Sequence, residues 1–306
     1  MMDGVSVNLD TLVALRGEAR HLNIAPRGQI VATRSGGHLS RFRGRGMEFD
    51  ESRAYQPGDD VRNMDWRVTA RAGRPHVKVY REERERPVWL LVDLGPSMRF
   101  GTRTAFKSVV AARAAALLGW AAADNGDRVG GLVYDETRHF EQRPTARGRG
   151  LLPLLKALSE APSAGAKGGY RSISDAAAHL TRLVRPGSLV FLLSDFAQVS
   201  SDAAVWLAAL SAGNEVVLAH IYDPLEAAAP PPGRYPVTNG AAARAVLDTR
   251  SPRLRQAYAQ RFAAHRARLA ELVLRYRAHR VEIPTDRPTG NALMQGLNPR
   301  RRTAFG

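Results

Sequence analysis

Residues 88–98 read VWLLVDLGPSM, and this stretch decides the fold. Its first five residues are all apolar, which is typical of a strand buried on both faces of a parallel sheet. Asp93 follows where such a strand ends, and Ser97 comes shortly after it. The sequence therefore predicts a buried strand that delivers a carboxylate and a hydroxyl to one edge of a sheet.

The residues after this strand alternate between helix and strand patterns. Apolar residues recur at helical spacing over residues 104–124, and strands are predicted at 128–134 (RVGGLVY) and 215–222 (EVVLAHIY). Residues 188–194 (SLVFLLS) are predicted to form a second fully buried strand, which Asp195 follows. Strands separated by helices favour an α/β fold, in which a mostly parallel sheet has helices on both faces.

We expect four parts along the chain. Residues 1–85 are an N-terminal extension with a Gly- and Arg-rich segment and an edge strand, at about 76–81, that packs on the core. Residues 86–225 are the α/β core. Residues 226–297 add a hairpin, a long helix and a last strand that complete the core, and residues 298–306 are a basic tail.

The composition narrows the classes of protein. The 306 residues include no cysteine, which excludes disulfides and thiolate metal sites and fits a cytoplasmic location. No apolar run reaches the roughly 18–20 residues of a membrane span, so no spanning helix is expected. The net charge of +16 favours an acidic partner surface, and an overall bias toward arginine is the alternative explanation. Scattered basic residues without a nucleic-acid motif argue against specific nucleic-acid binding.

Aspartates follow three of the predicted strands, at Asp93, Asp195 and Asp223. In open α/β sheets, function gathers at the carboxyl ends of the strands. Carboxylate and hydroxyl oxygens are suitable ligands for Mg²⁺. We favour a shared site for Asp93 and Asp195, with helix or turn capping as the alternative. For Asp223, which precedes Pro224, capping is the preferred interpretation.

Three segments resemble those that form the metal-ion-dependent adhesion site of the von Willebrand factor A fold, which is Rossmann-like. They are VWLLVDLGPSM at 88–98, SDAAAHL at 174–180 and FLLSDF at 191–196. Two upstream stretches, GRGMEF at 44–49 and YQPGDDVRNMDW at 55–66, resemble the signature of one bacterial branch, the domain-of-unknown-function family 58. The segments occur in the same order as in that family, from about residue 40 to about residue 286.

The resemblance implies that Asp93, Ser97, Ser174 and Asp195 surround a Mg²⁺ ion. The family pattern at the first segment is Asp-x-Ser-x-Ser, and Gly95 stands where the first serine is expected. Ser174 takes the place of the usual threonine and keeps a hydroxyl; it is also predicted to cap a helix. The loss of one hydroxyl ligand weakens Mg²⁺ binding without forbidding it, because Mg²⁺ keeps several waters.

The family signature in residues 55–66 has two interpretations. We expect a structural role, with a turn at Pro57 and Gly58, an ion pair between Arg62 and Asp65, and a Trp66 side chain that anchors the turn against the sheet. The alternative is a surface presented to a partner. The residues concerned are Tyr55, Asp59, Asp60, Arg62, Asp65 and Trp66.

The resemblance implies a non-catalytic interaction domain. Its partners would be a MoxR-type AAA+ ATPase and an unknown client protein, in chaperone-like complex assembly or maturation. The chain has no Gly-x-x-x-x-Gly-Lys-Ser/Thr phosphate loop, so ATP use would belong to the partner. Two alternatives stay open: a metal-dependent phosphohydrolase or nuclease that uses Asp93 and Asp195, and a non-specific nucleic-acid binder. Gly95 stands where a phosphoaspartyl enzyme has a second aspartate, which disfavours that kind of hydrolase.

Overall fold

The computed structural model describes residues 4–24, 47–57, 59–82, 85–146, 148–160, 169–170, 172–197, 199, 202–238 and 244–297. The chain forms two compact units. One consists of Met1–Pro26 and Arg86–Gly306, and the other of Arg27–Glu85. Most of the predicted Gly- and Arg-rich segment, Gly58 of the predicted turn and the predicted basic tail lie outside the described residues.

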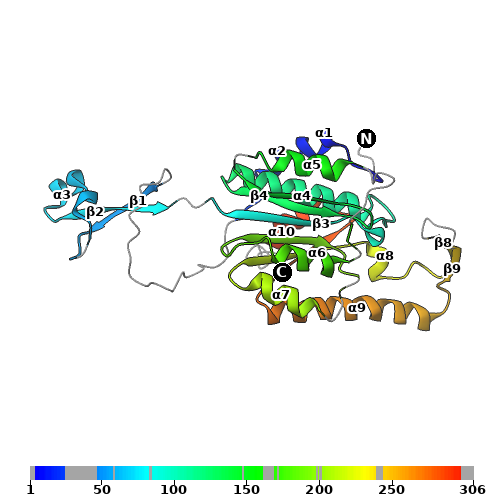
Figure 1. The fold of residues 1–306 in the computed structure, drawn as a ribbon. Helices are drawn as coiled ribbons and strands as arrows, with labels where there is room; N and C mark the ends of the chain where they lie inside the picture. The colour runs from blue at the N-terminus through cyan, green and yellow to red at the C-terminus, as the bar shows by residue number, and fades with distance from the viewer. Residues whose placement is uncertain are drawn as a thin grey trace. The chain divides into compact units, whose positions relative to one another are not determined.

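A six-stranded sheet forms the centre of the larger unit (Figure 1). Its strand order is β10-β7-β6-β3-β4-β5, and all neighbours are parallel except β4 and β5. The strands are β3 (Pro87–Asp93), β4 (Arg128–Tyr134), β5 (His139–Thr145), β6 (Leu189–Ser194), β7 (Glu215–Tyr222) and β10 (His279–Pro284). The predicted mixed α/β architecture with a mostly parallel sheet is confirmed.

Strand β3 is apolar because both of its faces are covered. Val88, Leu90 and Val92 belong to one apolar cluster, whereas Trp89 and Leu91 belong to the other. This division follows from the two-residue period of a strand, which points successive side chains to opposite faces. Each face of the sheet therefore takes alternate residues of the same run.

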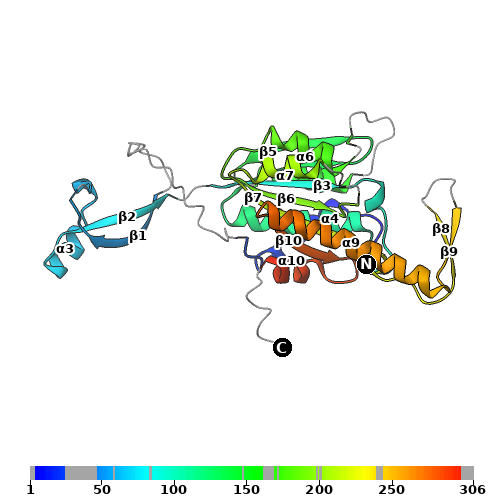
Figure 2. The ribbon, with the colours of Figure 1, turned by 90° about the horizontal axis from the view of Figure 1, so that it is seen from below.

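Helices cover both faces of the sheet (Figures 1 and 2). One apolar cluster includes residues of α1 (Leu9–Ala14), α2 (Arg16–Ala19), α4 (Lys107–Asp124), α5 (Leu151–Ser159) and α10 (Thr289–Leu297). The other includes residues of α6 (Ile173–Thr181), α7 (Ala203–Ser211) and α9 (Pro252–Arg275). The short helix α8 (Pro224–Ala227) follows β7, and β8 (Arg234–Thr238) pairs antiparallel with β9 (Arg244–Asp248). Among the described residues, no helix has the length and apolar character needed to cross a bilayer.

The first residues of the chain belong to the larger unit. Leu12, Leu15 and Ala19 are buried in the same apolar cluster as α4. The Arg86 guanidinium donates a hydrogen bond of 2.8 Å to the carbonyl of Ile24. The smaller unit is therefore an insertion between two points of the larger unit that lie side by side. A single extension over residues 1–85, as we predicted, does not describe this organisation.

The smaller unit has its own sheet. Strands β1 (Met47–Ala54) and β2 (His76–Glu82) pair antiparallel, and the 3-10 helix η1 (Val61–Asn63) and α3 (Trp66–Ala72) connect them. The predicted strand at 76–81 forms, but the prediction that it is an edge strand of the core was wrong, because its partner is β1 in a separate sheet. The partner strand was missed because apolar and polar residues of MEFDESRA alternate only over its first four positions.

Candidate functional site

The strand order changes direction at β3. The chain continues from β3 to β4 on one side and later places β6 on the other side. The crevice at the carboxyl ends of two such strands is the usual ligand position in an open α/β sheet. Asp93 ends β3, Asp195 directly follows β6, and both line one cavity of about 20 Å³ together with Ser97. The structure thus brings together three of the four residues that we predicted for a metal site.

Asp93 is held by hydrogen bonds inside the protein. It is 7% exposed; the Ser194 hydroxyl donates to Oδ2 at 2.7 Å, and the Gly95 backbone N–H donates to Oδ1 at 2.9 Å. Burial raises the pKa of Asp93, and the nearby charge of Asp195 raises it further, although the hydrogen bonds oppose both effects. Burial and the Asp93 charge also raise the pKa of the Tyr134 phenol well above its ordinary value. This corner of the cavity therefore disfavours further negative charge.

Gly95 leaves space that Asp93 uses. A Cβ atom at position 95 would lie 3.0 Å from Asp93 Oδ1, which is closer than ordinary packing allows. The Gly95 backbone, with φ −62°, is open to any residue. A side chain at position 95 would therefore require the Asp93 carboxylate to shift, whereas the backbone would not be strained.

Asp195 is bound by a lysine that we did not predict. The Lys107 ammonium lies 2.8 Å from Asp195 Oδ2 and 2.7 Å from Glu226 Oε1, and Lys107 is 1% exposed. Burial alone would lower the pKa of Lys107, but the two carboxylates outweigh it and the pKa is raised. Burial likewise would raise the pKa of Asp195, and Lys107 outweighs it, so that this pKa is lowered. Both groups of the pair are therefore ionised near neutral pH.

The lysine belongs to a polar network along the carboxyl ends of the strands. Glu226 accepts a hydrogen bond from the backbone N–H of Asp223, and the two residues form a capping box at α8. The Asp223 carboxylate accepts hydrogen bonds of 2.6 Å from the hydroxyls of Thr102 and Thr285. The network connects the ends of β6, β7 and β10 with the start of α4. The predicted capping role of Asp223 is confirmed.

Ser172 takes the place at the cavity that we predicted for Ser174. Ser172 lines the cavity and caps α6, because its Oγ accepts the N–H of Asp175 at 3.1 Å. Ser174 lies in the first turn of α6, where its hydroxyl accepts a hydrogen bond of 3.2 Å from the Trp206 indole. The prediction that Ser174 caps this helix was therefore wrong by two residues. Both positions carry a serine, and the sequence alone does not show which one precedes the first turn.

The residues at this cavity do not fit the Mg²⁺ site that the resemblance implies. Ser97 and Ser172 line the cavity, but Gly95 has no side-chain oxygen, the Ser172 hydroxyl is bonded to Asp175, and the Ser174 hydroxyl is bonded to Trp206. The ammonium of Lys107 is in direct contact with Asp195, and it would repel a second cation beside it. In the part of the chain that the structure describes, no three His, Asp or Glu side chains come together as a metal site.

Hydrogen bonds fasten the signature loop of the smaller unit. Asp59 forms an ion pair with Arg53 at 2.6 Å, and Asp60 caps η1. Tyr55 is half-buried, and its backbone N–H donates to the carbonyl of Pro75. These contacts agree with the structural interpretation of this part of the signature.

Two expectations for the end of this loop were wrong. Asp65 accepts hydrogen bonds from the Ser52 hydroxyl and from the first turn of α3, so it caps the helix instead of pairing with Arg62. Trp66 is 68% exposed and does not anchor the turn. The cap makes Trp66 the first residue of α3. An exposed tryptophan on an ordered helix agrees with the alternative interpretation, a surface presented to a partner.

These observations define a mixed α/β protein that has a buried, charge-paired site at the switch in strand order and an inserted β-hairpin unit. Residues 51–268 match the family described as protein of unknown function DUF58, and the chain belongs to this family. The predicted membership is thus confirmed.

Two mycobacterial proteins and two solved structures are among those that resemble this chain. The uncharacterized protein Rv1480 of Mycobacterium tuberculosis (strain ATCC 25618 / H37Rv) is 32% identical over 298 residues, which cover 95% of this chain and 91% of the relative. The uncharacterized protein Mb1516 of Mycobacterium bovis has the same identity and coverage. The conserved hypothetical protein BatB from Bacteroides thetaiotaomicron is 18% identical with a TM-score of 0.42, over 71% of this chain and 98% of that chain. An aerotolerance-related membrane protein from Bacteroides fragilis has the same identity and TM-score, over 69% and 98%.

Proposed function

We propose that this chain is a von Willebrand factor A-like, non-catalytic interaction domain that acts as a cytoplasmic adaptor for a MoxR-type AAA+ ATPase. The mostly parallel sheet, with Asp93 and Asp195 at the switch in strand order, supports the choice of fold. The ATPase partner and a role in complex assembly rest on the resemblance of the signature segments to family 58. The client is a further protein.

The size of the cavity between Asp93 and Asp195 carries the proposal. Its volume of about 20 Å³ corresponds to a single water molecule, whereas small-molecule sites usually enclose ~300–1,000 Å³. The carboxylate oxygens are already hydrogen-bonded to Gly95, Ser194, Ala197 and Lys107. A substrate could enter only if the loops after β3 and β6 moved. The arrangement therefore suits a rigid surface better than the active site of a phosphohydrolase or nuclease.

The proposed adaptor works without a divalent cation. Lys107 supplies a positive charge in contact with Asp195 at all times, because the lysine is buried and paired with two carboxylates. The loops at this edge are therefore held by the protein alone. The affinity for the partner would therefore be the same in Mg²⁺ and in a chelator.

The smaller unit offers the surface that a partner would contact. Trp66 and Val61 are 68% and 55% exposed, and Arg62 beside them is exposed. Tryptophan and arginine dominate the binding energy of many protein interfaces. The net charge of +16 would accelerate association with an acidic partner.

Binding of the purified MoxR-type ATPase to the full chain tests the proposal. Biolayer interferometry without nucleotide should give equal affinity in Mg²⁺ and in EDTA. Trp66→Ala should weaken binding by at least about tenfold. The matched control is Leu274→Ala, which also removes an exposed apolar side chain, 83% exposed on α9, and should bind like the wild type. No complex with the wild type, or equal binding by both variants, would refute the proposed contact.

A hydrolase assay tests the main alternative, a metal-dependent phosphohydrolase or nuclease. We expect no metal-dependent turnover of a generic phosphodiester. Turnover in Mg²⁺ or Mn²⁺ that disappears in Asp93→Ala would replace the adaptor by a hydrolase. Binding to DNA that falls steeply with salt, together with no ATPase binding, would favour the non-specific nucleic-acid binder instead.

A further inference from the structure

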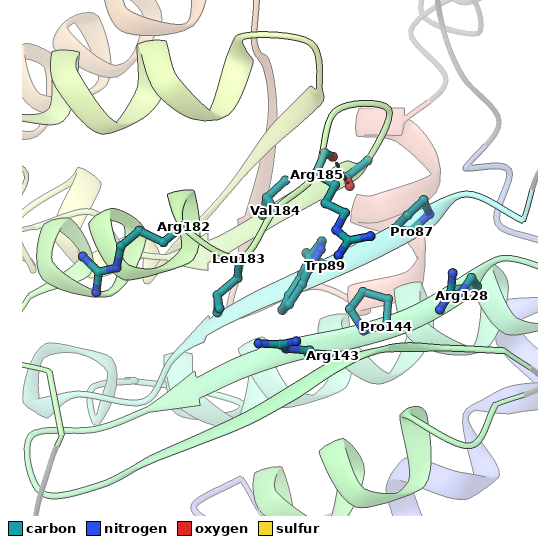
Figure 3. Close-up of a pocket in the computed structure, with 10 residues that line it drawn as sticks. Pro87, Trp89, Arg128, Arg143, Pro144, Arg182, Leu183, Val184 and Arg185 are labelled. Atoms are coloured by element: carbon teal, nitrogen blue, oxygen red, sulfur yellow. Dashed lines mark hydrogen bonds between the residues drawn. The ribbon is translucent and has the colours of Figure 1, made fainter.

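A second cavity lies at the other end of the sheet, where β3 and β4 begin (Figure 3). Its volume is about 400 Å³, which falls in the usual range for small-molecule sites. Four arginines line it, and we call it the arginine pocket: Arg128, Arg143, Arg182 and Arg185. No residue of the Asp93 cavity contributes to it.

The backbone on both sides of the arginine pocket is fixed by the fold. A Cβ atom on Gly130 of β4 would lie 2.4 Å from the carbonyl oxygen of Gln142, so only glycine allows β5 to approach this closely. The pairing of β4 and β5 is irregular at the same point, and Arg143 follows directly. On the other side, the Ser188 hydroxyl donates to the carbonyl of Arg185 at 2.6 Å and fixes the turn before β6. The arginines therefore project from ordered segments.

Within the described residues, no carboxylate pairs with an arginine of the pocket, although the Arg182 guanidinium is bonded to the His179 ring at 2.9 Å and extends away from Trp89 (Figure 3). No acidic side chain lines the pocket, and no ion pair of the described chain includes any of its four arginines. Figure 3 shows Arg143 and Arg185 on either side of Trp89, with Arg128 beyond Pro144. Like charges gathered in a cavity attract anions. The charge of the pocket therefore favours an anionic ligand.

The shape and chemistry of the pocket indicate the class of anion. Guanidinium groups bind phosphate through two parallel hydrogen bonds, and several of them suit a ligand with several phosphates. The remaining wall is formed by Pro87, Trp89, Pro144, Leu183 and Val184. Trp89 is 3% exposed, so its ring packs in the sheet and offers little surface for stacking. We propose that the arginine pocket binds a small molecule with two or more linked phosphates, either inorganic polyphosphate or a nucleoside polyphosphate.

Calorimetry with tripolyphosphate at constant ionic strength tests this proposal. We expect one binding site on the full chain. The double change Arg143→Gln and Arg185→Gln should weaken binding by at least about tenfold, because it removes two charged hydrogen-bond donors to phosphate. The matched control is Arg253→Gln with Arg268→Gln on α9, which removes the same charge from exposed positions outside the pocket. This control should change the affinity by less than about twofold.

The outcomes separate the proposal from its competitors. Tighter binding of Mg²⁺-free ATP than of tripolyphosphate would identify a nucleoside polyphosphate as the ligand, and equal or weaker binding of ATP would identify inorganic polyphosphate. Equal losses in the pocket and control variants would show unspecific attraction and overturn the proposal. Tighter binding of hexaglutamate, or no saturable binding of tripolyphosphate, would also overturn it. Unchanged thermal unfolding would show that the variants are folded. None of these outcomes depends on the proposed ATPase contact at Trp66.

Discussion

Lys107 stays charged in a place where a lone ammonium would lose its proton. Its residue exposure is 1%, and the removal of a cation from water costs several kcal/mol. Contacts of 2.8 Å to Asp195 and 2.7 Å to Glu226 offset that cost. Replacement of the cation alone would leave Asp195, itself 5% exposed, without its partner.

The change Lys107→Met should therefore destabilise the larger unit strongly. We expect a loss of about 3–5 kcal/mol in the free energy of unfolding, because a buried carboxylate remains unpaired. Urea denaturation followed by circular dichroism measures it. The control is Lys156→Met on α5, whose side chain is 70% exposed, and its effect should stay within about 0.5 kcal/mol. Equal, small effects of both changes would contradict a paired, buried Lys107.

The change Gly95→Ser tests the proposed independence from Mg²⁺. A serine restores the family hydroxyl, but its Cβ would press on Asp93 Oδ1 at 3.0 Å. We expect no saturable Mg²⁺ binding by calorimetry at millimolar concentration, either in the wild type or in the variant. The variant should also be less stable, by about 1–3 kcal/mol from overpacking. A Mg²⁺-dependent rise in melting temperature of the wild type would show that the cavity is a metal site after all.

Single residues mark the limit of what the sequence predicts at the site. The positions of Asp93 and Asp195 at the edge of the sheet could be predicted, because each follows an apolar run that is typical of a buried strand. The role of Lys107 could not be predicted, because a lysine at the start of a helix usually lies in solvent. Its partners are also distant in the sequence. Trp66 was misinterpreted because a bulky ring predicts burial, whereas this side chain is exposed at the start of α3.

At the scale of elements, the fold was largely predictable. Strands β4 and β7 have the predicted bounds, and β6 begins one residue after its predicted start, because the apolar pattern decides these segments. The pairing of β1 with β2 was not predictable, since charged residues fill β1. Register and partner depend on contacts between distant segments, which a single pattern does not encode.

Helix α9 packs on β7 around a buried histidine. The His220 ring lies 6.1 Å from Phe262 and 5.5 Å from Tyr222, measured between centroids, with His265 at 5.4 Å. Burial lowers the pKa of His220 from 6.5 to about 3, and His265 and Arg280 contribute to the shift. In the unfolded chain, His220 binds a proton below about pH 6.5, but in the folded chain it does so only near pH 3. Stability from this residue is therefore lost as the pH falls through that window.

The change His220→Leu should make the unfolding free energy less dependent on pH. Between pH 7 and pH 5, the wild type should lose about 2 kcal/mol more than the variant, because one proton binds only to the unfolded state. This window lies above the range in which most carboxylates titrate. Urea denaturation at several pH values measures the difference. Parallel curves for wild type and variant would mean that folded His220 is protonated in this range.

On the scale of the whole molecule, the chain is one α/β unit interrupted by an insertion. Ile24 and Arg86 flank the smaller unit, and the Arg86 guanidinium holds the Ile24 carbonyl at 2.8 Å. Arg86 also forms ion pairs with Asp127 and Glu215. The two ends of the insertion are thus fixed by contacts within the larger unit. The larger unit should therefore fold without residues 27–85.

Replacement of residues 27–85 by a flexible linker tests this organisation. About six Gly and Ser residues span roughly 12–15 Å on average, which suffices for ends that lie side by side. We expect the shortened chain to unfold cooperatively, with a stability within about 1 kcal/mol of the larger unit in the full chain. It should no longer bind the MoxR-type ATPase, because Trp66 is removed.

A core substitution in the shortened chain is the control for this prediction. Leu90 is fully buried in β3, so Leu90→Ala should cost about 2–5 kcal/mol there, as in the full chain. A broad, non-cooperative transition in urea, or no effect of Leu90→Ala, would show that the larger unit needs its insertion to fold. Retained binding of the ATPase by a folded shortened chain would move the partner contact from Trp66 to the larger unit. The same pair of measurements thus tests the folding of the larger unit and the position of the partner surface.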